Sequence, residues 1–229
     1  MNKQIETAAG DGAAAVDSPA GDGAAAVDSP AERIADVSRV TKETGICVRL
    51  NLDGTGNTSI ETGIGFLNHL LDAFARHGRF DLVLKCTGDL GIDDHHTAED
   101  CGLVIGQAIS RALGDRKGIR RFGYAYAPLD EALARAVVDI SGRAYADVNT
   151  DLERERLGEL SCENVGHILQ SMAATAGITM HVDVIKGRND HHKAEAAFKA
   201  VGLALRGAVA MSAFEDVPST KGKIDRGIQ

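Results

Sequence analysis

Apolar and polar residues alternate clearly between positions 44 and 57. Val48, Leu50 and Leu52 are separated there by polar residues, which is the period of a half-buried β-strand. The sequence DGTGN ends the alternation, and glycine and asparagine favour turns. We therefore predict a strand that is followed by a turn.

Longer segments of the first half have helical spacing. Between Phe66 and Phe74, large apolar residues recur every three or four positions, so segment 63–78 is predicted to be a helix. A strand at 79–89 and a second helix at 95–115 are predicted in the same way.

The second half repeats this order of elements. We predict strands with a turn near Pro128 in 124–149, a helix at 162–177, a strand at 178–187 and a helix at 191–210. The halves, 31–120 and 121–229, each run strands, helix, strand, helix. The pattern predicts an α+β fold in which a duplicated half-domain forms one domain over 31–229.

The first thirty residues have a different composition. AGDGAAAVDSP occupies 9–19 and is repeated without change at 20–30. Such a segment has too little apolar surface to offset its ordering entropy, so we predict a disordered tail over 1–30. An inert tandem duplication is favoured over a functional tail.

Composition limits the class of protein. The formal charge is −8 with no basic stripe, which argues against nucleic acid as a partner. No apolar run reaches the length of a membrane span, and the start lacks the pattern of a signal peptide. The four cysteines are scattered without a C-x-x-C motif. We expect reduced, mostly buried thiols and a cytoplasmic location.

One string occurs twice. DDHHTAED at 93–100 returns as NDHHKAEA at 189–196. Each copy follows a histidine of the preceding predicted helix, His69 in the first half and His167 in the second. The string is therefore a landmark of the duplicated half-domain.

Histidine and glutamate at this spacing suit a metal ion. His96 and Glu99 are three positions apart, which we expect to place them on one helix face, whereas His95 is rotated by about 100° and should face another metal or partner. The second copy predicts the same arrangement for its own residues, namely His191, His192 and Glu195. The aspartate before each pair, Asp94 or Asp190, is expected to cap its helix.

Eight candidate metal ligands result. An isolated histidine is usually structural, and His77 and His181, which have no counterpart in the other half, are interpreted that way. Two matching copies favour a metal site. Nitrogen and oxygen donors without a nearby cysteine suit Mn²⁺, Fe²⁺, Co²⁺ or Zn²⁺.

Cations next to small residues form a second feature. Arg121, Arg143, Lys199 and the sequence PSTKGK at 218–223 could bind an anion. Each cation taken alone is more typical of a solvated surface charge.

Together these segments resemble the imidazoleglycerol-phosphate dehydratases from about Arg39 to Lys221. The sequences that carry the resemblance are TKETGICVRLNLDGTGN, TGIGFLNHLLDAFARHGRFDL, DDHHTAEDCGLVIGQA, ISGRA, NDHHKAEAAFKA and PSTKG. The resemblance implies helices packed between two sheets and a homo-oligomer of 24 chains. It also implies two Mn²⁺ ions per active site at subunit interfaces.

The resemblance also assigns roles to residues. It implies metal ligands at His69, His95, His96, Glu99, His167, His191, His192 and Glu195. It implies a substrate-binding acid at Glu43 and phosphate contacts at Arg121, Arg143, Lys199, Ser219 and Lys221. Ala73 stands where many relatives have glutamine, so a substrate contact there is missing.

The implied reaction converts imidazole glycerol phosphate to imidazole acetol phosphate in histidine biosynthesis. The hydrogen to be removed has no adjacent carbonyl, so an imidazolate held by metal ions is expected to expel the hydroxyl. Glu195 or Glu43 is the expected base, with Glu99 as a competitor. A dinuclear metallohydrolase and a metal-storage protein remain as alternatives.

Overall fold

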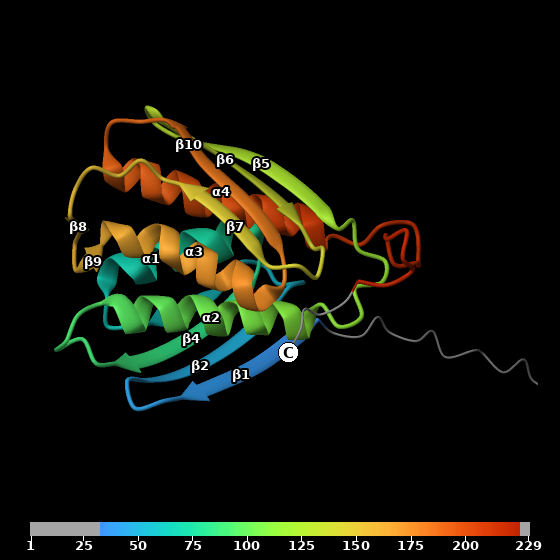
Figure 1. Cartoon of the computed structure of the whole chain (residues 1–229), viewed down its shortest axis with the longest axis horizontal. Coiled ribbons are helices and arrows are strands. Elements are labelled where there is room, and N and C mark those ends of the chain that lie inside the picture. The colour runs from blue at the N-terminus through green and yellow to red at the C-terminus, as the bar shows by residue number, and fades with distance from the viewer. Residues whose placement is uncertain (1–32, 225–229) are drawn as a thin grey trace, which may run out of the picture. The chain divides into compact units, whose positions relative to one another are not determined.

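The computed structural model describes residues 33–224. The tail and its repeat at 1–30 lie outside the described residues. In the described part, four helices lie between two four-stranded sheets (Figure 1). This arrangement confirms the predicted α+β class and the layered packing.

Each half contributes one sheet and two helices. The first half contains β1 (Ile34–Val40), β2 (Thr44–Asn51), β3 (Thr58–Glu61), α1 (Gly65–Gly78), β4 (Asp81–Gly88) and α2 (His95–Ala112). The second half contains β5 (Phe122–Leu129), β6 (Ala132–Asp139), β7 (Tyr145–Asn149), the short pair β8 (Arg156–Leu157) and β9 (Leu160–Ser161), α3 (Cys162–Ala176), β10 (Thr179–Lys186) and α4 (Asp190–Val209).

The two sheets have the same topology. Their strand orders are β1-β2-β4-β3 and β5-β6-β10-β7. In each, three antiparallel strands are followed by an edge strand that pairs in parallel, β3 with β4 and β7 with β10. The matching order confirms the duplication predicted from the sequence.

The structure adds strands that were not predicted. β1 pairs antiparallel with β2, with Val37 opposite Val48. β1 buries only Ala35 and Val37, and β3 has four residues, none of them fully buried. Their apolar signal is too weak to identify them in the sequence, and pairing with a neighbouring strand defines them instead.

Helices of different halves cross closely. α2 packs against α3, and α1 packs against α4. At each crossing stands a glycine eleven residues after the first histidine of the repeated string. A Cβ atom on Gly106 would lie 2.3 Å from the Met172 carbonyl oxygen, and one on Gly202 would lie 2.3 Å from that of Phe74. Only glycine permits this backbone approach.

The four helices begin at one end of the domain, whereas the C-terminal segment 210–224 lies at the other end (Figure 1). None of the helices in the described residues is long and apolar enough to cross a membrane. The four cysteines form no disulfide, and two of them, Cys101 and Cys162, are buried.

Candidate metal centres and anion pocket

The crossing of α2 and α3 brings together His95, Glu99 and His167. One possible ligand atom of each lies within 4.8 Å of those of the other two. The His167 Nε2 atom is 3.3 Å from the Glu99 Oε1 atom, and the His95 and His167 rings are stacked with their centroids 5.0 Å apart. We call these three residues the first cluster.

The crossing of α1 and α4 forms a matching second cluster from His69, His191 and Glu195. The Glu195 Oε2 atom lies 2.9 Å from the His69 Nε2 atom and 3.2 Å from that of His191. Each cluster thus joins a histidine–glutamate pair of one half with a histidine of the other half.

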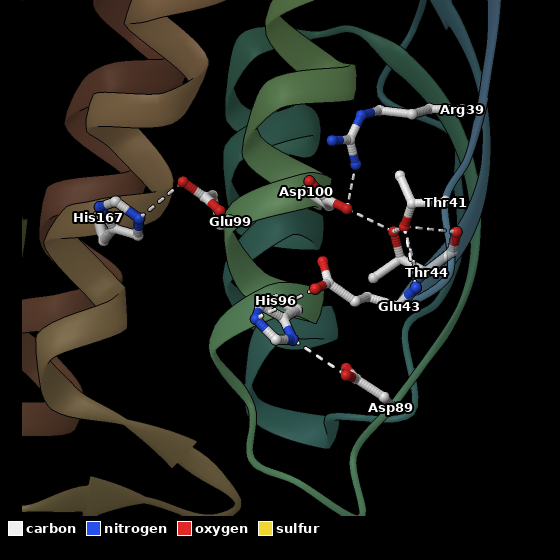
Figure 2. Close-up of polar contacts among 9 residues, drawn as sticks. All are labelled: Arg39, Thr41, Glu43, Thr44, Asp89, His96, Glu99, Asp100 and His167. Atoms are coloured by element: carbon white, nitrogen blue, oxygen red, sulfur yellow. Dashed lines mark hydrogen bonds and ion pairs between the residues drawn. The ribbon is translucent and has the colours of Figure 1, made fainter.

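The pairing within the repeated string differs from the prediction. The structure pairs His95 with Glu99, four positions apart, where a pairing of His96 with Glu99 was predicted. Figure 2 shows Glu99 directed toward His167 on α3 and His96 on another side of α2. Residues four apart are separated by about 40° around a helix, less than the roughly 60° of residues three apart. His191 and Glu195 pair in the same way.

The predicted caps are also wrong. The Asp94 side chain makes no cap bond on α2, and instead accepts hydrogen bonds from the N–H and hydroxyl of Ser161, at 2.6 and 2.7 Å. Asp190 accepts the N–H groups of residues 153–154, and Asn189 caps α4. Each buried aspartate therefore holds the segment that leads into α3.

The charge around Glu195 distinguishes the second cluster. The Lys199 ammonium lies 2.6 Å from the Glu195 Oε1 atom. Burial opposes ionisation of this carboxyl, but hydrogen bonds from Lys199 and His69 outweigh burial and lower the pKa of Glu195 to about 2. Lys199 therefore lies at the second cluster, apart from the other predicted phosphate contacts. The corresponding residue in the first half is Leu103.

His96 and His192 face away from the clusters toward carboxylates. The His96 Nδ1 atom is 3.0 Å from Asp89, and its Nε2 atom is 3.9 Å from Glu43 (Figure 2). The His192 Nδ1 atom is 2.7 Å from Glu131. These hydrogen bonds raise the pKa of both histidines. Asp89 and Glu131 were not predicted, because neither belongs to a motif and only folding brings them to the histidines.

Most predicted phosphate contacts meet in one pocket. Arg121, Arg143, Ser219 and Lys221 line a cavity of about 400 Å³. Arg121 is held by two bonds to Asp139, at 2.7 and 3.2 Å, and has a left-handed backbone with φ 72°. Strained backbone of this kind concentrates at functional sites. Fixed guanidinium and hydroxyl donors around a cavity suit a phosphate group.

The clusters fit a transition metal ion. The Nε2 atom of His167 is buried and makes no hydrogen bond to any described residue, and its near neighbour is the Glu99 carboxylate at 3.3 Å. A metal ion between the two side chains would satisfy both. Each cluster offers two imidazoles and one carboxylate. None of the four cysteines belongs to either cluster, so thiolate sites are excluded there.

Comparisons with known proteins agree with this geometry. The family model of imidazoleglycerol-phosphate dehydratase matches residues 62–205. The dehydratase of that name from Candida glabrata is 51% identical over 208 residues, which cover 82% of this chain and 99% of the relative. The Phytophthora nicotianae relative is 60% identical over 190 residues, and the chain spans only 42% of its greater length.

Solved structures give the same result. The imidazoleglycerol-phosphate dehydratase of Staphylococcus aureus superposes with a TM-score of 0.71 at 38% identity, covering 78% of this chain and 99% of that one. The Pyrococcus furiosus structure, solved in complex with (S)-C348, superposes with a TM-score of 0.70 at 35% sequence identity. The match covers 82% of this chain and 99% of that one. The chain therefore belongs to the imidazoleglycerol-phosphate dehydratase family of hydro-lyases.

Proposed function

We propose that the chain dehydrates imidazole glycerol phosphate to imidazole acetol phosphate with two metal ions, one bound by each cluster. Family membership supports the overall reaction in histidine biosynthesis. The observation that carries the metal dependence is the matching pair of His₂Glu clusters at the two helix crossings.

Mn²⁺ is the proposed metal because the family resemblance implies it. The imidazole and carboxylate donors are compatible with Mn²⁺ but also with Fe²⁺, Co²⁺ or Zn²⁺. A metal ion bound at such a site acts as a Lewis acid that lowers the pKa of a substrate group. The protein's part is to hold the donors in place. His69, His95, Glu99, His167, His191 and Glu195 would do so within one chain.

The remaining parts of the site come from different places. His96 and His192 face away from the clusters of their own chain, and the anion pocket contains segment 219–221, at the opposite end of the domain from the helix starts (Figure 1). One chain therefore cannot present its clusters and its anion pocket to one small substrate. We propose active sites between subunits of a homo-oligomer, and the family resemblance favours 24 copies.

The cations would orient the substrate through its phosphate. Arg121, Arg143, Ser219 and Lys221 line the pocket, and donors fixed in this way hold a phosphate without further ordering cost. Lys199 is bound to Glu195, so within the chain it sets the charge of the second cluster.

Glu43 is the proposed proton-abstracting base. It lies outside both clusters, on the β1–β2 turn, and its Oε1 atom is 3.9 Å from the His96 Nε2 atom. Glu195 is a weaker candidate, because a carboxyl with a pKa of about 2 binds a proton poorly at neutral pH. Glu99 would serve as a metal ligand in the first cluster, as Glu195 would in the second.

A cytoplasmic location completes the proposal, since four cysteines that form no disulfide suit a reducing compartment.

The test is to incubate metal-free protein with imidazole glycerol phosphate, with and without Mn²⁺, and to assay imidazole acetol phosphate. We expect product only with Mn²⁺, loss of activity with a chelator, and two bound ions per chain. Equal activity in the metal-free protein would refute the metal dependence. Binding of many ions per chain without product would favour a storage protein.

A further inference from the structure

The two histidines that face away from the clusters are each held by a carboxylate. The Glu131 Oε2 atom lies 2.7 Å from the His192 Nδ1 atom, and the Asp89 Oδ2 atom lies 3.0 Å from that of His96. A carboxylate only accepts hydrogen bonds. The ring nitrogen that faces it must therefore carry the hydrogen.

The other nitrogen of each ring makes no hydrogen bond within residues 33–224. The His192 Nε2 atom is 4.0 Å from Asp130, and His192 lines a cavity of about 470 Å³ together with Arg154 and Arg188. The His96 Nε2 atom is 3.9 Å from Glu43. With the hydrogen on Nδ1, the Nε2 atom of a neutral ring offers a lone pair to a ligand.

We propose that Glu131 and Asp89 are positioning residues, which fix the hydrogens of His192 and His96 on Nδ1 so that each Nε2 atom is presented to a metal ion. This inference rests on the proposed metal-dependent function. Carboxylates that orient a metal-binding histidine in this way affect metal affinity by about 10–100-fold when they are removed.

The two carboxylates occupy different places in the duplicated halves. Glu131 is on the β5–β6 turn, whereas Asp89 follows β4. Their own surroundings differ too. The Glu131 Oε1 atom accepts the N–H groups of Asn189 and Arg188, at 2.8 and 3.2 Å. The Asp89 Oδ1 atom is buried and has no hydrogen-bond partner among the described residues.

This difference allows a sharp test with amide substitutions. In Glu131→Gln the single carbonyl oxygen must serve the two backbone N–H groups, so the NH₂ group faces the Nδ1 atom of His192. That nitrogen must then accept, and the ring hydrogen moves to Nε2, where it blocks the lone pair. In Asp89→Asn no backbone donor competes, and the carbonyl oxygen can still face His96.

The experiment titrates each metal-free protein with Mn²⁺ and measures the unbound ion by electron paramagnetic resonance. We expect Glu131→Gln to weaken one of the two Mn²⁺ affinities by about 10–100-fold. Asp89→Asn should stay close to wild type. The Glu131→Ala variant should bind Mn²⁺ better than Glu131→Gln, because the His192 ring is then free to adopt either tautomer. This is expected although the alanine variant loses the two hydrogen bonds from the backbone N–H groups of Arg188 and Asn189. Glu61→Gln, at an exposed ion pair with Lys85, is the control for loss of a surface charge.

The outcomes separate the two proposals. If wild-type protein binds no Mn²⁺, the proposed metal centre fails, and this inference fails with it. If wild type binds Mn²⁺ and Glu131→Gln binds it equally well, only the positioning role is overturned. A Glu131→Ala variant that binds Mn²⁺ worse than Glu131→Gln would show that Glu131 merely supports the loop. Urea unfolding midpoints of the variants report that structural role independently.

Discussion

The first and second clusters share a plan but differ in charge. Each joins a His–Glu pair, four positions apart at a helix start, with a histidine of the other half. In the second cluster Lys199 contacts Glu195, whereas Leu103 stands at the corresponding position of the first half and can supply no charge.

The comparison separates donor geometry from electrostatics. The duplicated helix, with its glycine at the crossing, reproduces the positions of the donors. Lys199, eight residues after the first histidine, is one of the two hydrogen-bond donors that lower the pKa of Glu195, and the first half has no cation at the corresponding position. The two clusters therefore contain the same residue types but differ in the charge next to their glutamate.

The largest expected effects come from removing one histidine per cluster. His69→Ala and His167→Ala should each reduce the metal content from two ions per chain to one and abolish activity, because each removes a donor from one cluster only. Metal analysis of purified protein and the dehydratase assay measure both effects.

His96→Ala and His192→Ala provide the matched comparison. These histidines face away from their own clusters, so the substitutions should abolish activity and also weaken assembly, as measured by analytical ultracentrifugation. A fully active, normally assembled His96→Ala or His192→Ala variant would contradict the proposal of sites between subunits.

A smaller effect is expected at the two helix crossings. Gly106→Ala and Gly202→Ala should each lower the free energy of unfolding by about 1–3 kcal/mol, because the added methyl group meets a backbone carbonyl. Urea unfolding of the metal-free protein measures the change. Gly45→Ala, where no atom lies within 4 Å of the added Cβ, is the control. If Gly106→Ala is as stable as wild type, α2 and α3 can move apart at their crossing without loss of stability.

An effect of similar size, confined to acid pH, concerns the charge difference itself. Lys199→Leu copies the first half and should raise the pKa of Glu195 from about 2. Because the pKa of Glu195 is lower in the folded protein than its ordinary value of 4.5, the ionised carboxylate stabilises the fold at pH values above 4.5. This stabilisation is lost as the pH falls from 4.5 toward 2. Between pH 4.5 and pH 2, the free energy of unfolding of the metal-free wild type should therefore fall by on the order of 2 kcal/mol more than that of Lys199→Leu.

Urea unfolding at several pH values above and below 4.5 measures this difference. Identical acid dependence in the two proteins would mean that Lys199 does not control the ionisation of Glu195.

Much of the fold could be predicted because its elements carry strong local patterns. Helix 63–78 was predicted within two residues of α1, and segment 162–177 within one residue of α3. β1 and β3 could not be predicted, because strand pairing rather than apolar content defines them. The donor pairing was also mispredicted, since i,i+3 and i,i+4 neighbours both lie on one helix side and only the packing of α2 on α3 distinguishes them.

The sequence alone predicted the duplication, the α+β class, the family resemblance and eight candidate metal ligands, six of which the structure brings together in the two clusters. These features depend on local periodicity and on the repeated string. Only the tertiary structure decided that each cluster combines residues from both halves and that the Lys199 ammonium contacts Glu195 in the second cluster. It also decided that Asp89 and Glu131 form hydrogen bonds with His96 and His192. These contacts join residues up to 126 positions apart in the chain. Long-range contacts of this kind follow from the packing of helices and turns, which no local pattern encodes.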